Sequence, residues 1–164
     1  MITHATTLDI AAIQQIAQIT WANTYGIILS AEQVRYMLGT IYSTSSLERQ
    51  MQENHRFFIL KEDTESIGFI DMEKISDEKT KLHKLYLLPN QQGKGYGIKL
   101  INFALEKAKE QDSSVLQLNV NRFNKQAIRF YQKSGFQVVE QVDIPIGNGY
   151  FMNDFIMEKS LIQE

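Results

Sequence analysis

Residues 85–97 read Leu-Tyr-Leu-Leu-Pro-Asn-Gln-Gln-Gly-Lys-Gly-Tyr-Gly and join a strand pattern to a helix pattern. The strand pattern covers Lys81–Leu88 and stops at Pro89, which cannot donate a hydrogen bond to a strand ladder. The helix pattern covers Gly97–Gln111, because apolar residues recur there at helical spacing along one side. The segment therefore predicts a strand, a glycine-rich turn and an amphipathic helix in direct succession.

Three alternating glycines stand in this turn, at the start of the predicted helix. The first amide N–H groups of a helix have no acceptor within the helix, and a phosphate can come close to them where Cβ atoms are missing. The stretch Pro89–Leu105 contains no acidic residue and carries two lysines. The pattern favours an anion-binding turn, and the alternative is a glycine turn that only reverses the chain.

Two common phosphate-binding motifs do not fit this turn. A Walker motif requires glycine at position 88 and Ser or Thr at position 95, where this chain has Leu88 and Gly95. A dinucleotide-binding fingerprint requires a third glycine at position 98 or 100, where the chain has Ile98 and Leu100. The turn therefore belongs to neither the Walker class nor the dinucleotide-binding class of phosphate site.

The rest of the chain predicts an α+β domain with a largely antiparallel sheet. Apolar or alternating runs predict further strands at Met1–Ala5, Arg56–Lys61, Ser66–Lys74, Val115–Val120, Phe136–Asp143 and Tyr150–Lys159. Further helices are predicted after an N-cap at Thr7, after a capping box at Ser30–Gln33, over Ser46–Asn54, and from the cap Asn124 to Gly135. No repeat or low-complexity tract interrupts the chain, so residues 1–164 are expected to form a single domain.

Composition excludes several classes of protein. The 164 residues carry 17 Lys and Arg against 19 Asp and Glu, a formal net charge of -2 that gives no general nucleic-acid footprint. The absence of cysteine excludes disulfides, thiolate metal sites and cysteine nucleophiles. The N-terminus has no basic and then apolar leader, and no apolar run approaches the roughly 18 residues of a membrane span. We therefore expect a cytoplasmic protein with neither nucleic acid nor a membrane as partner.

The glycine turn and a second segment together resemble a known family. Gln92–Gly97 fits the pattern Gln/Arg-x-x-Gly-x-Gly/Ala of the GNAT superfamily of N-acetyltransferases, and Asn124–Phe136 is similar to the second diagnostic block of that family. The close resemblance covers Leu82–Phe136. It implies a GNAT-like mixed, mostly antiparallel central sheet of about six to seven strands, about four flanking helices, and fourth and fifth strands that splay apart.

The resemblance implies that acetyl-CoA is the cosubstrate. Its diphosphate would lie on the amides of the glycine turn, and its pantetheine arm would pair with the backbone of the preceding strand. The residues implied to bind acetyl-CoA are Leu85, Tyr86, Leu87, Gln92, Gly93, Lys94, Gly95, Tyr96, Gly97, Ile98, Asn124 and Tyr131.

The resemblance also assigns the role of general acid to Tyr131, near the end of the helix that Asn124 caps. A tyrosine at this place in the family brings its hydroxyl to the CoA sulfur, where the departing thiolate benefits from a proton. From the residues alone, Tyr131 is one of several aromatic residues near a helix C-terminus, and core packing is the alternative. A backbone amide near Leu87 is the implied donor to the tetrahedral oxyanion.

The general base is less clearly marked. Some relatives carry a glutamate on the fifth strand where this chain has Asn119, and an amide cannot usefully accept a proton at neutral pH. Strand alternation places His83 on the same face as Leu85 and Leu87, so His83 is the candidate base and Glu73, acting through water, is the fallback. The alternative for His83 is a partly exposed histidine without a catalytic role. The three histidines are far apart in the sequence and no His-Glu-x-x-His spacing exists, so no metal site is expected.

Aromatic and acidic residues mark the expected acceptor side. The resemblance implies an acceptor pocket between the first two helices, the splayed strands and the last hairpin, where Trp21, Tyr25, Glu73 and Asp154 are the candidate substrate-binding residues. Aromatic walls and carboxylates suit a cationic amine. The segments that carry them resemble those of polyamine N-acetyltransferases. Core packing of the aromatic residues and solvated strand-face charges are the alternatives.

The leading hypothesis is that acetyl passes from acetyl-CoA to a primary amine, with a small molecule such as a polyamine favoured, by direct attack on the thioester. One alternative is an acyl-CoA-binding sensor or interaction module without turnover, which Asn119 in place of a carboxylate motivates. Another alternative is acetylation of a protein N-terminus or lysine. The expected partners are acetyl-CoA and the amine acceptor, and a homodimer is left open.

Overall fold

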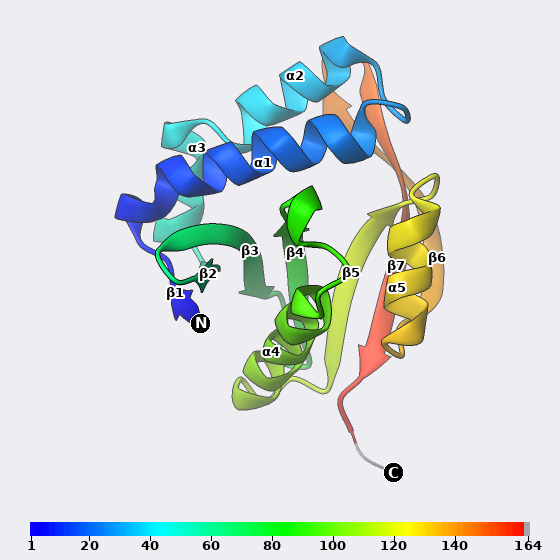
Figure 1. Ribbon diagram of the computed structural model, residues 1–164. Helices are drawn as coiled ribbons and strands as arrows, with labels where there is room; N and C mark the ends of the chain where they lie inside the picture. Colours follow the sequence, from blue (N-terminus) through cyan, green and yellow to red (C-terminus); the bar gives the residue numbers. More distant parts are fainter. Residues whose placement is uncertain (163–164) are drawn as a thin grey trace.

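The computed structural model describes residues 1–162 and shows a seven-stranded sheet with helices on both faces (Figure 1). The strands are β1 (Ile2–His4), β2 (His55–Glu62), β3 (Glu65–Lys74), β4 (Lys79–Leu87), β5 (Val115–Asn121), β6 (Gln137–Gly147) and β7 (Tyr150–Ser160). The helices are α1 (Ile10–Tyr25), α2 (Ala31–Ile41), α3 (Thr44–Gln52), α4 (Tyr96–Glu110) and α5 (Lys125–Lys133), with short 3-10 turns η1 (Thr7–Asp9) and η2 (Pro89–Gln91).

The strands lie in the order β1-β2-β3-β4-β5-β7-β6, and each neighbouring pair is antiparallel except β4 and β5. This confirms the predicted mixed α+β fold. The parallel ladder joins only Lys79–Leu82 to Val115–Leu118, and the two strands diverge beyond it, as predicted for the fourth and fifth strands (Figure 1). Five α-helices flank the described sheet, where about four were expected.

Two apolar clusters hold the helices against the sheet. Helices α1, α2 and α3 cover one face, where Trp21 and Tyr25 pack in a cluster with Phe69 of β3 (Figure 1). Helix α4 covers the other face, where Leu100 packs in a cluster with Ile70 of β3. We call these the α1 face and the α4 face. From Phe69 to Met72, neighbouring residues of β3 alternate between them, which is the period of a strand whose two sides are both buried.

The N-terminal helical segment begins one residue earlier than predicted, as the 3-10 turn η1 at Thr7, and α1 itself begins at Ile10. The expectation that Thr7 is its N-cap is wrong, because the Thr6 hydroxyl accepts a hydrogen bond from the amide of Leu8. The Asp9 carboxylate accepts one from the amide of Thr6, which completes a capping box around η1, and α1 follows directly. A single turn of tighter helix before α1 explains the shift.

Two other helix starts also differ in detail. Ser43 caps α3 by accepting from the amide of Ser46, so this helix covers Thr44–Gln52 rather than Ser46–Asn54. Ser30 caps α2 as predicted, but the side chain of Gln33 donates to the carbonyl of Phe151 instead of closing a capping box. This contact connects α2 to β7.

The last hairpin is longer than predicted. Strand β6 was expected to end at Asp143, but its ladder with β7 continues to the pair Gly147 and Tyr150. Gly147 and Gly149 have φ angles of 92° and 77°, which glycine adopts without strain and which close the hairpin. None of the described helices is long and apolar enough to cross a membrane.

Candidate active site

The divergence of β4 from β5 leaves one side of β4 without a strand partner. The ladder of β4 with β5 ends at Leu82, whereas its ladder with β3 continues to the pair Gly68 and Leu87. The backbone of Leu85–Leu87 therefore has β3 on one side and the gap on the other. An extended ligand can add to such an edge by main-chain hydrogen bonds, as a further strand would. The segment predicted to pair with pantetheine lies at this edge.

The glycine turn leads from this edge into α4. Gly93 and Gly95 have φ angles of 79° and 88°, in the left-handed region that favours glycine. Gly95 is the N-cap of α4, and no side chain caps the helix, so the first amides of α4 have no intrahelical acceptor. A Cβ atom at Gly93 or Gly95 would meet no heavy atom within 4 Å, so the space in front of the turn is open.

The side chains of the turn leave its backbone accessible. Lys94 Nζ donates to Gln91 Oε1 at 3.2 Å, within the turn itself. The Tyr96 hydroxyl donates to Glu62 at 2.6 Å, which takes this ring toward the β2–β3 hairpin. A Cβ atom on Gly97 would lie 3.4 Å from the ring of Phe130, so the third glycine allows α5 to approach α4. Gln92 and Ile98 were also predicted to bind acetyl-CoA, and both lie on this turn.

Helix α5 carries the two predicted residues Asn124 and Tyr131. Asn124 Oδ1 accepts from the amide of Ala127, which confirms it as the helix cap. The Tyr131 ring packs edge-on against Phe130 and Phe136, with centroid distances of 5.4 and 5.9 Å. Burial raises the pKa of Tyr131 to about 12, so the phenol keeps its proton at neutral pH.

Tyr131 lies close to an aromatic group from α1 and β4. The rings of Trp21 and Tyr25 have centroids 4.6 Å apart, and Tyr86 of β4 lies 6.4 Å from Trp21. Burial raises the pKa of Tyr25 well above its usual value, and the neighbouring Tyr86, Tyr131 and Asp154 raise it further. The pKa of Tyr25 thus responds to the predicted acid Tyr131 and to Asp154, while its ring packs against Trp21.

Asp154 is a buried carboxyl with unusual surroundings. Its residue is 6% exposed, and Asn119 Nδ2 donates to its Oδ2 across 3.4 Å. Its Oδ1 and the Oδ1 of Asn119 have no hydrogen-bond partner in the part of the chain described. Burial raises the pKa of Asp154, and the influences of Asn119, Lys81 and Arg122 oppose that rise. The sequence predicts a missing carboxylate at Asn119, but the β5–β7 ladder, which pairs Asp154 with Asn121, brings the Asp154 carboxyl within reach of the Asn119 side chain.

A β-bulge in β4 contradicts the predicted orientation of His83. Asp71 of β3 lies opposite Lys84, whereas Met72 lies opposite Leu82, so His83 is an extra residue in the ladder. The bulge breaks the simple alternation on which the prediction depended.

The faces on either side of the bulge can be read from their neighbours. Leu85 and Leu87 belong to the α4-face cluster, as the prediction assumed. His83 Nε2 lies 3.0 Å from Glu73 Oε1, and Glu73 follows the α4-face residue Met72, so both side chains are on the α1 face. His83 thus lies on the opposite face from Leu85 and Leu87. Burial lowers its pKa, against the opposing influence of Asp71 and Glu73.

The two remaining candidates for the general base, His83 and Glu73, form a contact group with His55. His83 and Glu73 contact each other and His55, whose ring centroid is 4.5 Å from that of His83. Sequence distance alone suggested that the histidines would be separate, and for this pair that expectation is wrong. Burial lowers the pKa of Lys81, and the negative charges of Asp154 and Glu73 both oppose that fall. Lys81 is therefore near both the Asp154 carboxyl and the His83–Glu73 pair.

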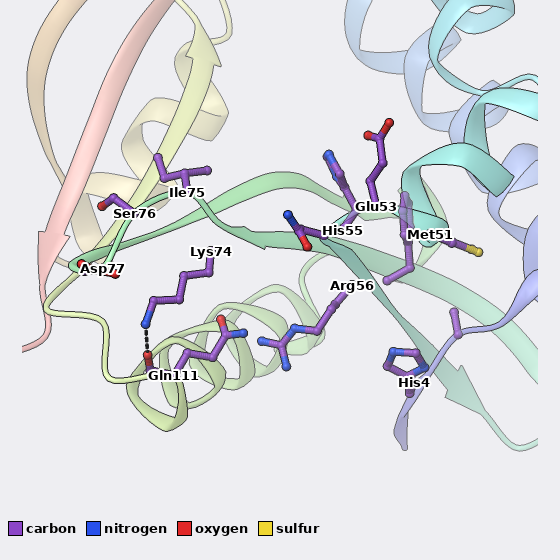
Figure 2. Close-up of a pocket in the computed structure, with 13 residues that line it drawn as sticks. His4, Met51, Glu53, His55, Arg56, Lys74, Ile75, Ser76, Asp77 and Gln111 are labelled. Atoms are coloured by element: carbon purple, nitrogen blue, oxygen red, sulfur yellow. Dashed lines mark hydrogen bonds between the residues drawn. The ribbon is translucent and has the colours of Figure 1, made fainter.

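A separate hollow lies at the far end of β2 and β3. Figure 2 shows this pocket of about 640 Å³, where Lys74 donates to the carbonyl of Gln111. Its lining includes His55 but neither Tyr131 nor any residue of the glycine turn. The pocket is therefore distinct from the gap between β4 and β5.

Known proteins share both the sequence pattern and this architecture. Residues 13–136 match the acetyltransferase (GNAT) family. An uncharacterised N-acetyltransferase of Lactobacillus delbrueckii subsp. lactis, from the pepI 3' region, is 27% identical over 162 residues, covering 94% of this chain and 93% of that protein. PaiA N-acetyltransferase from Thermoplasma acidophilum, in complex with coenzyme A, is similar with a TM-score of 0.84 and 29% identity, covering 98% of each chain.

More distant relatives share the fold alone. The ribosomal-protein-S18-alanine N-acetyltransferase of Escherichia coli has a TM-score of 0.75 and 18% identity, covering 100% of this chain and 95% of that one. The family match spans most of the sequence, including the glycine turn, the divergent strands and α5. With its fold and its relatives in agreement, this chain belongs to the GNAT family of N-acetyltransferases.

Proposed function

We propose that the protein transfers acetyl from acetyl-CoA to the nitrogen of a small cationic primary amine by direct attack. The observation that carries the proposal is the open edge of β4 at Leu85–Leu87, which leads into the uncapped start of α4. The similar PaiA protein has coenzyme A bound in its crystal structure, which supports acetyl-CoA as the donor here.

The donor would lie along the open edge. Backbone amides from Gly93 to Ile98 are free to hold the diphosphate, since a helix start favours anions. The β4 backbone at Leu85–Leu87 would pair with the amide groups of pantetheine, and Asn124 would contact the same arm from α5. This arrangement carries the thioester toward Tyr131 and fixes the carbonyl for attack.

Tyr131 would serve the leaving group. When the amine nitrogen bonds to the carbonyl carbon, the tetrahedral intermediate collapses, the carbon–sulfur bond breaks, and the sulfur takes the electron pair. A phenol with a pKa of about 12 is protonated at neutral pH, so its hydroxyl can donate to the developing thiolate. A backbone amide near Leu87 would donate to the oxyanion.

Asp154 would accept the proton that the amine must lose. Its carboxyl is near enough to Tyr25 to raise the pKa of that phenol, as Tyr131 also does, and its Oδ1 has no partner in the described residues. A raised pKa makes a carboxylate a better base near neutral pH. We assign this role to Asp154 rather than to His83 or Glu73, because the bulge turns His83 toward His55 and Glu73.

A small cationic acceptor fits the residues around this carboxyl. Trp21 and Tyr25 are buried side by side and would turn aromatic faces to an ammonium group that enters beside them, and Asp154 would supply a negative charge in a buried setting. Glu73 lies further along the same face, where a second ammonium of a polyamine could be held. These features support a polyamine as the first acceptor to try.

The test is thiol release from acetyl-CoA with a panel of polyamines, arylalkylamines, amino acids and peptides. The proposal expects turnover with at least one diamine or polyamine at a kcat/KM well above that for peptides. Coenzyme A affinity is measured separately on the same protein. Binding of coenzyme A without turnover on any amine would favour a sensor, and faster turnover of peptides would favour a protein acceptor.

A further inference from the structure

A cluster of three metal-ligating side chains lies on the α1 face, outside the group around Tyr131. His55 of β2, Glu73 of β3 and His83 of β4 offer ligand atoms that all lie within 4.8 Å of one another. His83 Nε2 lies 3.0 Å from Glu73 Oε1, and His55 Nε2 lies 3.7 Å from Glu73 Oε2. Three consecutive strands thus bring two imidazoles and one carboxylate to a single point.

The β4 bulge is what completes this cluster. Without an extra residue in the ladder, either His83 or Lys84 would point to the opposite face of the sheet. With it, His83 meets Glu73 while Lys84 Nζ still reaches Asp71 at 2.6 Å. The bulge therefore places His83 and Lys84 together on the α1 face, where they contact Glu73 and Asp71.

Asp71 orients one of the two imidazoles. Its fully buried carboxylate lies 2.7 Å from His55 Nδ1, so that nitrogen donates its proton and the lone pair remains on Nε2. Nε2 is the atom that faces Glu73. A carboxylate behind a histidine in this way is the usual outer support of a metal ligand, because it fixes both the tautomer and the ring orientation.

The separations match the bond lengths of a tetrahedral ion. Zinc binds imidazole nitrogen and carboxylate oxygen at about 2.0–2.2 Å, which puts two ligand atoms about 3.4 Å apart at a tetrahedral centre. The distances of 3.0 and 3.7 Å lie on either side of that value. The three ligand atoms lie within 4.8 Å of one another, so binding one ion requires side-chain rotations that bring the more widely separated atoms closer together.

We propose that His55, Glu73 and His83 form a binding site for one divalent transition metal ion of the zinc type, with Asp71 as a positioning residue. Calcium and magnesium prefer oxygen ligands and suit this set poorly. The three side chains are 15%, 24% and 23% exposed, so solvent can supply the fourth ligand. The proposal goes beyond the acetyl transfer proposed above and does not require it, and a metal ion bound by Glu73 would exclude the second ammonium of a polyamine from that carboxylate.

The competing explanation is an ion pair between a protonated histidine and Glu73, with no metal. A titration of the EDTA-treated, dialysed full-length protein with Zn²⁺, in competition with a chromophoric chelator, separates the two. The site predicts one equivalent of Zn²⁺ per chain. Co²⁺ in its place should give the intense visible absorption of tetrahedral coordination, a readout that does not depend on acetyl transfer.

Variants assign the site to its residues. His83→Gln and Glu73→Gln should each weaken Zn²⁺ binding at least about tenfold, and Asp71→Asn by about 10- to 100-fold, in line with the loss of an outer support. His4→Gln removes the histidine outside the cluster and should leave the affinity unchanged. Circular dichroism checks folding, and His83 and Glu73 are exposed enough that their variants are the decisive ones.

Two results would overturn the proposal. One is the absence of saturable Zn²⁺ binding up to about 100 μM, a concentration far above the Kd expected of a two-histidine, one-carboxylate site. The other is binding that His83→Gln and Glu73→Gln leave as tight as in the unaltered chain. Coenzyme A affinity and amine turnover are measured on the metal-free protein, so failure of the metal site and failure of the proposed function are seen separately.

Discussion

Replacing Asp154 with asparagine should lower activity and at the same time leave the protein equally or more stable at neutral pH. The carboxyl is buried, its Oδ1 has no partner in residues 1–162, and the one donor from Asn119 is long at 3.4 Å. Asparagine has the same shape and no charge. Its new N–H group can donate to Asn119 Oδ1, which also has no partner in that range.

The direction of the stability change follows from the pKa. Burial raises the folded-state pKa of Asp154 above its unfolded value, so the folded form holds this proton more tightly. The ionised carboxyl therefore costs stability at pH values above both pKa values, and the cost disappears as the pH falls below the unfolded one. The new hydrogen bond to Asn119 would contribute about 0.5–1.5 kcal/mol. For a chain of this size, each kcal/mol of added stability raises Tm by about 2–4 °C.

The direction of the activity change follows from the proposed proton transfer. Loss of a general base lowers the rate by about 10²- to 10⁴-fold, or about 3–5 kcal/mol of barrier. The assay is kcat/KM against pH for the Asp154→Asn variant, with thermal unfolding at pH 7 and at acid pH. In the unaltered enzyme the acid limb of the profile should lie above the range of an ordinary carboxyl, and the variant should lack it.

Asp143→Asn is the matched control, because this carboxyl on β6 is 59% exposed and pairs with Arg122 at the surface. Its variant should keep the activity and the pH profile. Unchanged kcat/KM in Asp154→Asn would refute the assignment of the base. A joint loss of activity and of Tm at pH 7 would show that Asp154 holds the fold together instead.

Three further substitutions probe the other parts of the site. Tyr131→Phe keeps the ring contacts with Phe130 and Phe136, so kcat should fall by about 100-fold or more while coenzyme A affinity changes less than about twofold; a matching loss of affinity would argue for a binding role. Gly95→Ala places a side chain at a φ of 88°, which costs about 1–2 kcal/mol of strain and should weaken coenzyme A binding. Its control is Gly39→Ala, which lies in helical backbone with open space around it and should stabilise the chain. His83→Gln should leave the pH dependence of kcat/KM as it is, and a lost acid limb would return the role of base to His83.

Local signals account for most of what the sequence predicted correctly. The strand, turn and helix at residues 81–111 depend on near neighbours, on a proline that ends a ladder, and on glycines that accept positive φ angles. Asn124 was predicted as a cap from its position before an amphipathic segment, and its side chain does accept from Ala127. Each of these features is decided within a few residues.

The bulge at His83 could not be predicted in this way. Leu82 lies three residues before Leu85, so the apolar residues of β4 break strict alternation, but the extra residue is identified only when the partners in β3 are known. The same is true of the pairing of His55 with His83, which depends on β2, β3 and β4 lying side by side. Long-range register, rather than residue type, decides which chemistry these side chains share.

Asp154 shows the same limit at the candidate active site. The missing carboxylate at Asn119 was visible in the sequence, but its replacement from β7 was not, because 35 residues separate the two positions. The β5–β7 ladder brings them together. The resemblance placed Asp154, in the predicted last strand, among the acceptor-binding residues rather than in the role of base.

The structure of the protein with coenzyme A bound tests the account most directly. We predict that the diphosphate oxygens lie about 2.7–3.2 Å from backbone amides between Gly93 and Ile98. The pantetheine arm should run along Leu85–Leu87, and the sulfur should lie beside the Tyr131 hydroxyl. Coenzyme A held elsewhere, with the gap between β4 and β5 empty, would contradict it.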